Sequence, residues 1–238
     1  MRDETIQRLR RLNQEFYQTF AKSFAETRAR LQPGVVRILK NIAPQAAVLD
    51  LGCGHGELAA ALTRNGHHGR YLGLDASAVL LSIACERSQH PQVRFQQADL
   101  SDPDWSDGLP APFDHIFAFA VLHHIPGQEQ RQRVVQQIYS LLASGGRFVS
   151  SNWNFMASPR LRARIMSWET VDIEDDELET GDYLLDWRRG GKGLRYVHLF
   201  NETELKDLAD ETGFEIIETF YSDGEGGRLG LYQVWEKE

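Results

Sequence analysis

Glycines at alternate positions are the first feature of this sequence that could bind a ligand. Gly52, Gly54 and Gly56 directly follow an apolar, strand-like run and precede a stretch with helical spacing, a context in which the backbone can approach a ligand closely. Dinucleotide-binding loops have the spacing G-x-G-x-x-G, so that the start of the helix receives a pyrophosphate. Here the spacing is G-x-G-x-G and Asp50 precedes it, and this acid repels a phosphate but attracts an ammonium. The loop therefore favours S-adenosylmethionine, which has an amino group and no phosphate.

Two further acids stand at the ends of the next two apolar runs. Asp75 ends the run 71–75, and Asp99 follows the run 93–98. Asp75 can accept hydrogen bonds from both ribose hydroxyls, and Asp99 can accept one from the adenine amino group. Each acid alone could equally cap a helix. Three acids at successive strand ends, beside a glycine loop, favour a nucleoside site at the carboxyl edge of a parallel sheet.

The fourth apolar run, residues 115–120, is expected to end at the same edge of the sheet. We therefore expect Ala120 and His123 to face the transferred methyl group or its acceptor. His124 follows directly. A pair of histidines is as often structural as catalytic, and the sequence leaves both interpretations open.

Apolar runs of strand length alternate with helical stretches through residues 44–151. This alternation predicts a parallel sheet with helices on both faces, which forms the cofactor-binding core. In residues 200–238, Asn201 and Glu204 occupy the N-cap and capping-box positions of a predicted helix. Two apolar runs that flank residues 223–227 then predict a terminal antiparallel hairpin.

The remaining segments do not fit the alternation of strands and helices. Residues 1–43 have apolar positions three and four apart and predict a helical cap of one or two helices lying on the core. Residues 152–199 are rich in arginine, tryptophan, acids and glycine, and they are too long for a plain connector. We predict that they form a lid or substrate insertion, so that residues 1–238 make one domain.

The formal net charge of −8 argues against nonspecific binding of nucleic acid by the whole surface. Phosphate binding requires a local excess of lysine and arginine. Basic clusters occur at residues 160–164 and 188–195, with an acidic run at residues 172–179 between them. Such runs are usually solvated faces, so the clusters alone do not identify a partner.

The cysteine count and the hydropathy pattern restrict the setting of the protein. Cys53 and Cys85 are the two cysteines, and no cysteine or histidine cluster has the spacing of zinc ligands. We expect no disulfide and no bound metal. The chain begins with polar residues and no stretch approaches the roughly 18 apolar residues of a membrane span. We therefore expect a cytoplasmic protein that does not contact a membrane.

The core motifs resemble those of the class I methyltransferases. Residues 48–56, 73–77 and 98–100 carry this resemblance, which covers about residues 44–150. It implies an α/β, Rossmann-like fold with a seven-stranded, mostly parallel sheet, a terminal antiparallel hairpin and helices on both faces. It also implies S-adenosylmethionine as the cofactor, held by the three glycines and three acids together with Ala76, Leu100, Ala120 and His123.

Three other stretches resemble the tRNA wobble-uridine carboxymethyl methyltransferases. They are residues 17–28, residues 120–124, and residues 181–187 with 195–200. That family methylates the carboxylate of 5-carboxymethyluridine in the anticodon loop and works with a small zinc-ribbon activator protein. The resemblance therefore implies tRNA as the substrate and a protein that is a monomer or a heterodimer with such an activator.

The same resemblance assigns roles to residues outside the core. Tyr17 and Arg28 are expected to close over the methionine end of the cofactor, with the Arg28 guanidinium pairing its carboxylate. The alternative is that Tyr17 packs and Arg28 lies on the surface.

A carboxylate acceptor is ionised at neutral pH, so it needs to be held and aligned rather than deprotonated. The residues expected to hold it, with lid packing as the alternative for each, are His124, Trp187, Arg195, Tyr196 and His198. Trp187 is in addition a candidate platform on which an unstacked base could lie.

Other functions remain compatible with the core motifs. A small-molecule O- or C-methyltransferase would use the same core, and the net charge of −8 suits a small substrate. A catalytically silent cofactor-binding subunit of a partner protein is a second alternative. An NAD oxidoreductase fits least well, because the glycine spacing differs from that of a dinucleotide loop.

Overall fold

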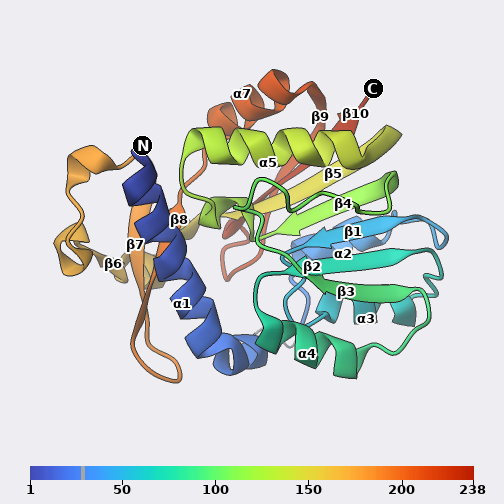
Figure 1. Ribbon diagram of the computed structural model, residues 1–238, viewed down its shortest axis with the longest axis horizontal. Helices are drawn as coiled ribbons and strands as arrows, with labels where there is room; N and C mark the ends of the chain where they lie inside the picture. The colour runs from blue at the N-terminus through green and yellow to red at the C-terminus, as the bar shows by residue number, and fades with distance from the viewer. Residues whose placement is uncertain (28–29) are drawn as a thin grey trace.

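The computed structural model describes residues 1–27 and 30–238, and its main sheet has seven strands in the order β3-β2-β1-β4-β5-β10-β9 (Figure 1). The strands are β1 (Val48–Leu51), β2 (Tyr71–Asp75), β3 (Val93–Gln97), β4 (Phe113–Phe119), β5 (Leu142–Trp153), β9 (Phe214–Ser222) and β10 (Gly230–Lys237). Neighbours from β3 to β5 are parallel, whereas β10 is antiparallel to both β5 and β9. The predicted seven-stranded, mostly parallel sheet with a terminal antiparallel hairpin is confirmed.

Helices cover both faces of this sheet, and every residue of β1 is buried between them. One face packs against α5 (Gln128–Leu141) and α7 (Glu202–Thr212), and the other against α2 (Pro33–Leu39) and α3 (Glu57–Arg64). A further helix, α4 (Ala78–Arg87), begins where the Ser77 side chain accepts a hydrogen bond from the Leu80 backbone N–H. Asn201 caps α7 as predicted, because its Oδ1 accepts from the Glu204 backbone N–H.

The segment between β5 and α7 forms a second, three-stranded antiparallel sheet that the sequence did not predict. Its strands are β6 (Ile165–Met166), β7 (Asp182–Trp187) and β8 (Gly193–His198). The short helices η2 (Phe155–Ala157) and α6 (Pro159–Arg162) precede β6, and η3 (Trp168–Val171) and η4 (Asp175–Glu177) lie between β6 and β7. Neighbouring residues of β7 are buried on opposite faces, since Leu184 packs with Leu9 and Leu185 with Phe155. A sheet covered on both faces lacks the apolar and polar alternation by which strands are recognised.

The first helix, α1 (Asp3–Thr27), lies between the two sheets (Figure 1). Its apolar stripe packs against the second sheet, where Leu9 contacts the group of Tyr196, and Phe16 and Phe20 contact Trp187. The sequence predicted a helix lying on the core; α1 does contact α4 of the main domain, but its apolar stripe packs on the second sheet (β6, β7 and β8), which we call the lid sheet. Within the described parts of the chain, no helix is both long enough and apolar enough to cross a membrane.

A network of charged side chains joins the second sheet to the main domain. His198 of β8 donates from Nδ1 to Asp182 Oδ1 and from Nε2 to Glu204 Oε1, both at 2.7 Å. Arg131 of α5 donates to Glu179 Oε2 at 2.8 Å and lies 3.5 Å from Glu204 Oε1. Because both ring nitrogens of His198 face carboxylate oxygens, the imidazolium is the form that satisfies every partner.

Burial of the His198 ring opposes its charge, but the hydrogen bonds to Asp182 and Glu204 outweigh burial and the nearby Arg131 guanidinium, and they raise the pKa of His198 above its ordinary value. A raised folded-state pKa gives stability that is complete below the unfolded pKa and is lost as pH rises through the folded one.

We expect the His198→Gln variant to be less stable than the parent protein by about 3 kcal/mol at about pH 6, the cost of breaking a buried charged pair. The difference should shrink as the pH rises above about 6.5 and through the raised pKa of the folded protein, because the parent ring then loses its proton. Urea unfolding across this range measures it. His68→Gln at an exposed position is the matched control, and a His198→Gln deficit that is constant with pH would contradict the assignment.

Candidate functional site

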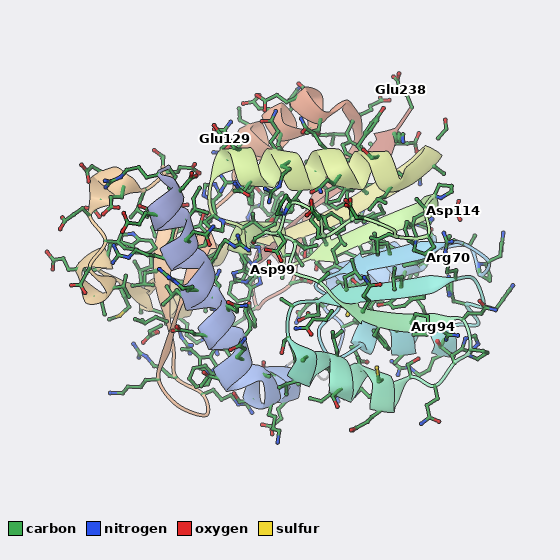
Figure 2. The ribbon with its side chains drawn as sticks, viewed as in Figure 1. Arg70, Arg94, Asp99, Asp114, Glu129 and Glu238 are labelled. Carbon is green, nitrogen blue, oxygen red and sulfur yellow. The ribbon has the colours of Figure 1, made fainter. Side chains whose placement is uncertain are left out.

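A pocket of about 350 Å³ opens at the carboxyl edge of the main sheet. Its walls come from the ends of β1, β2, β4 and β5, from α1, and from the β9-β10 hairpin. Figure 2 shows Asp99 beside α1 on this side, whereas Arg70, Arg94 and Asp114 lie at the opposite edge. The topology thus places the predicted strand-end residues together in one cavity.

The glycine loop turns sharply between β1 and α3, and each of its three glycines has a positive φ. A Cβ on Gly52 would lie 2.5 Å from the Val121 Cγ2, whereas a Cβ on Gly54 would meet no atom within 4 Å. Both glycines line the pocket. Gly56 is absent from the described lining, and a Cβ there would meet Ala84, so this glycine permits close packing of α3 and α4 rather than the ligand contact that was expected.

Asp75 holds the loop in place from the end of β2. Its Oδ2 accepts from the Gly54 backbone N–H and its Oδ1 from the Ser77 backbone N–H, both at 2.8 Å. Burial raises the pKa of Asp75, and the two backbone hydrogen bonds partly offset this. Each carboxylate oxygen has a second lone pair, so the group can still accept from the two hydroxyls of a ribose.

Asp50 is 3% exposed at the end of β1 and accepts a hydrogen bond from the Tyr71 hydroxyl. The pKa of Asp50 is raised to about 7. Burial raises this pKa most, the hydrogen bond from Tyr71 partly offsets the rise, and the nearby Asp75 charge adds to it. Among the described residues, neither of these two carboxyls forms an ion pair with a lysine or arginine. The site is therefore suited to receive positive charge from a ligand.

Asp99 closes the far side of the pocket together with α1. Its Oδ1 accepts from the Ser101 backbone N–H at 2.9 Å, and its Oδ2 lies 3.3 Å from the Arg10 guanidinium, which also pairs with Asp102. Ala76 and Leu100 line the pocket beside it. Arg10 was not predicted, because no local motif marks a helical arginine as the partner of a strand-end acid.

The end of β4 has an unusual backbone. Ala120 lines the pocket with φ of 60° and its N–H donates to the Ser151 carbonyl oxygen at 2.9 Å. A non-glycine residue in this region costs about 1–3 kcal/mol, and such strain is concentrated at functional sites. The strained turn directs the following residues, 121–124, towards α1 and β8.

Tyr17 of α1 and His124 meet at the mouth of the pocket, with the hydroxyl 2.7 Å from His124 Nε2. His124 Nδ1 lies 3.1 Å from the Tyr196 carbonyl oxygen, which can only accept a hydrogen bond. In the neutral ring, Nδ1 therefore carries the proton and Nε2 accepts from the Tyr17 hydroxyl. The predicted closing residue Tyr17 and the predicted acceptor residue His124 form one hydrogen-bonded pair.

Several other predicted residues are buried away from the described lining. These are His123, Trp187, Arg195, Tyr196 and His198. Tyr196 donates to Asp182 and His198 belongs to the charged network, so both stabilise the lid sheet instead of reaching a substrate. Trp187 packs on α1 and cannot offer the open stacking face that was expected of it. The predicted Arg28 lies outside the described residues.

Trp153, at the end of β5, occupies the pocket wall that was expected for Trp187. The Arg195 guanidinium lies 4.4 Å from the Trp153 ring centroid, and the His123 ring lies 5.3 Å from it. Arg195 and His123 therefore support the ring from behind. No sequence pattern marked Trp153, because β5 was expected to end before it.

Asn13 joins three elements around the mouth of the pocket. Its amide donates to the His124 and Tyr196 carbonyl oxygens and accepts from the Tyr196 N–H at 2.8 Å. The residue is 7% exposed and lies on the apolar stripe of α1, four residues after Leu9. A polar residue within an apolar helical stripe was the sequence signal that could have identified it.

The comparisons with known proteins agree with this geometry. The family described as "Methyltransferase domain" matches residues 23–219. The chain belongs to this methyltransferase family. Two solved proteins that share this fold, at 18% and 16% identity, hold S-adenosylmethionine or its product S-adenosylhomocysteine.

Individual relatives of this methyltransferase differ in their acceptors. A tRNA (carboxymethyluridine(34)-5-O)-methyltransferase from Schizosaccharomyces pombe is 25% identical over 226 residues, covering 87% of this chain and 90% of that protein. A trans-aconitate 2-methyltransferase from Deinococcus radiodurans is 35% identical over 103 residues, covering 43% of this chain and 36% of that protein. A solved S-adenosylmethionine-dependent methyltransferase from Methanosarcina mazei covers 87% of this chain and 98% of its own, with a TM-score of 0.63 and 21% identity, which establishes the fold.

The residues present fit S-adenosylmethionine. Its sulfonium and ammonium groups are positive, and the buried Asp50 and the half-buried Asp75 have no basic partner among the described residues. Asp75 can accept from the ribose, and Asp99 from the adenine amino group. Gly54 leaves open space for the methionine part, whereas the missing side chain of Gly52 makes room for Val121.

We expect the affinity for S-adenosylmethionine to increase about ten-fold between about pH 6 and about pH 8. Asp50 is protonated and neutral below its pKa of about 7, and the cation binds the ionised form. Calorimetry of the parent protein and of Asp50→Asn measures this, and the variant should bind weakly with little change over the range. Asp114→Asn, at the opposite edge of the sheet, is the control; an unaltered pH dependence in Asp50→Asn would refute the role of Asp50.

Proposed function

We propose that this methyltransferase esterifies the carboxylate of 5-carboxymethyluridine at the wobble position of tRNA. The observation that carries the proposal is the match over nearly the full length of both chains to the Schizosaccharomyces pombe tRNA methyltransferase. The match includes the lid region, where acceptor specificity is expected to lie. A similarity limited to the cofactor core would not distinguish one acceptor from another.

The pocket offers a place for an unstacked nucleobase next to Ala120. Trp153 is half-buried, lines this part of the pocket and has its ring supported by Arg195 and His123. Single-stranded bases are commonly held by stacking on aromatic side chains, at about 1–3 kcal/mol per base. In this proposal Trp153 takes the stacking role that the sequence suggested for Trp187.

The side chains around the acceptor would position a group that is already reactive. S-adenosylmethionine, when bound, supplies a methyl group on a positively charged sulfur. A carboxylate oxygen of the acceptor would take this methyl group, and the electron pair of the broken carbon–sulfur bond would stay on sulfur. The carboxylate is ionised at neutral pH, so no base is required, and alignment and exclusion of water are what the protein contributes. The hydroxyl of Tyr17, held by His124, can turn to donate to the carboxylate.

A small carboxylic acid is the second candidate acceptor, and the similarity to a trans-aconitate methyltransferase favours it. The described lining contains two arginines, Arg10 and Arg30, and more acids than that. The five acids are Asp50, Glu57, Asp75, Asp99 and Asp223. Such a pocket does not itself attract a polyanion. The trans-aconitate relative shows that this core can serve a small acid in another protein, although the match covers less than half of this chain.

The zinc-ribbon activator, a heterodimer with it and a cytoplasmic location belong to the same proposal. They follow from the tRNA assignment, and the assay below therefore treats the activator as a variable. A monomer that is active alone is the other outcome consistent with the proposal.

The test is a tritium-transfer assay with labelled S-adenosylmethionine and the full chain, alone and with a zinc-ribbon activator. The substrates are tRNA that carries 5-carboxymethyluridine, the same tRNA with uridine, and trans-aconitate. We expect base-labile label, as a methyl ester releases, in the first substrate only. Unlabelled modified tRNA in both conditions, together with labelled trans-aconitate, would replace the proposal with the second candidate.

A further inference from the structure

A basic groove lies on the face formed by α2, α3 and α4, and no role follows for it from the cofactor pocket. We call it the α2-α4 groove. Its cations are Arg30, Lys40, Arg64 and Arg87, and Glu57 is the carboxylate among its described lining residues. In a protein with a net charge of −8, four cations against one acid are a marked local reversal of sign. A groove of this kind favours an anionic partner.

The single acid of the groove is already neutralised and organises two of the cations. Glu57 Oε1 accepts from Arg64 at 3.1 Å and its Oε2 accepts from Arg87 at 2.9 Å. The Glu57 side chain is 16% exposed, whereas those of Arg64 and Arg87 are 63% and 38% exposed. A guanidinium has five donors, so each arginine can bind a further oxygen while it keeps its bond to Glu57.

Stabilisation of helix ends explains only part of the arrangement of these cations. Lys40 is the C-cap of α2, and Arg64 and Arg87 end α3 and α4. Cations at helix C-termini interact favourably with the helix dipole, typically by about 0.3–1 kcal/mol. This accounts for a cation at each helix end. It does not account for three helix ends and Arg30 lining one groove.

The groove adjoins the cofactor pocket. Arg30, Leu31 and Glu57 line both cavities. Val36 is 44% exposed within the groove, so apolar surface accompanies the cations. A nucleoside or a small acid that reaches the methyl group would end inside the pocket. An occupant of both cavities must extend beyond the acceptor group and carry negative charges at intervals.

We propose that the α2-α4 groove binds the phosphodiester backbone of the RNA that flanks the acceptor nucleoside. This inference rests on the proposed function, since it takes tRNA as the substrate. Phosphate contacts position an RNA without reading its sequence, and the arginines and the lysine of the groove supply such contacts. The acids of the cofactor pocket would repel the phosphates of an RNA, and the groove offers these phosphates a separate, basic surface. The base enters the acidic pocket while the phosphates remain on the basic face.

The test compares two charge reversals of equal size. Lys40→Glu lies in the groove, and Arg94→Glu lies on the exposed edge strand β3, at the opposite edge of the sheet from Asp99 in Figure 2. The combined variant Lys40→Glu with Arg64→Gln strengthens the effect. The dissociation constant for tRNA with 5-carboxymethyluridine is measured by filter binding between about 50 and 200 mM salt. Affinity for S-adenosylmethionine, measured on the same samples, reports correct folding of each variant.

We expect Lys40→Glu to weaken tRNA binding on the order of ten-fold and to reduce the slope of affinity against salt by about one phosphate contact. The combined variant should lose more. Arg94→Glu should bind tRNA like the parent protein, and all variants should keep their affinity for the cofactor.

Equal tRNA binding by the groove variants and the parent protein, with the parent active on tRNA, would overturn the groove and leave the proposed function intact. Equal losses in Lys40→Glu and Arg94→Glu would show a general charge effect and would also overturn it. A parent protein that neither binds nor methylates tRNA would refute the proposed function, and the groove assignment with it.

Discussion

Two neighbouring carboxyl groups at the carboxyl edge of the sheet, one buried and one half-buried, are the constraint around which this site is built. Asp50 and Asp75 lie at the ends of adjacent parallel strands, and burial and mutual repulsion hold the pKa of Asp50 near 7. In place of a basic partner, Asp50 accepts a hydrogen bond from Tyr71, and Asp75 accepts hydrogen bonds from the backbone N–H groups of Gly54 and Ser77. These hydrogen bonds stabilise the two carboxylates. A cationic cofactor relieves the repulsion, so the affinity for S-adenosylmethionine follows from the cost of burying the acids.

The parts that close the site depend on contacts made far from the cofactor. Asn13 attaches α1 to the backbone of His124 and Tyr196, which sets the Tyr17–His124 pair at the mouth of the pocket. The charged network of His198, Asp182, Glu204 and Arg131 then attaches the lid sheet to α5 and α7. Tyr196 and His198, which the sequence suggested as acceptor ligands, thus hold the elements that surround the pocket.

The cofactor half of the site could be predicted from sequence because its signals are local. Asp50, Asp75 and Asp99 each follow a recognisable strand, and parallel topology brings the strand ends together. The acceptor half could not be predicted in this way. Trp153 comes from an unmarked strand end, and Arg10 reaches Asp99 from a helix 89 residues earlier in the chain. For Trp187, Arg195 and Tyr196 the sequence left acceptor binding and lid packing both open, because it does not show whether the insertion forms a sheet. A sheet that α1 covers on one face buries them instead.

The acidic pocket and the basic α2-α4 groove together describe a protein with two surfaces of opposite charge next to each other. The acidic surface selects a cationic cofactor, and the basic one suits the backbone of a long anionic substrate. This division explains how a chain with a net charge of −8 could act on RNA without a basic surface overall.

The most direct test of this account is mass spectrometry of wobble nucleosides from the source organism after deletion of the gene. We predict that 5-carboxymethyluridine accumulates and its methyl ester disappears, and that the parent gene restores the ester. An unchanged level of the methyl ester in the deletion strain would contradict it.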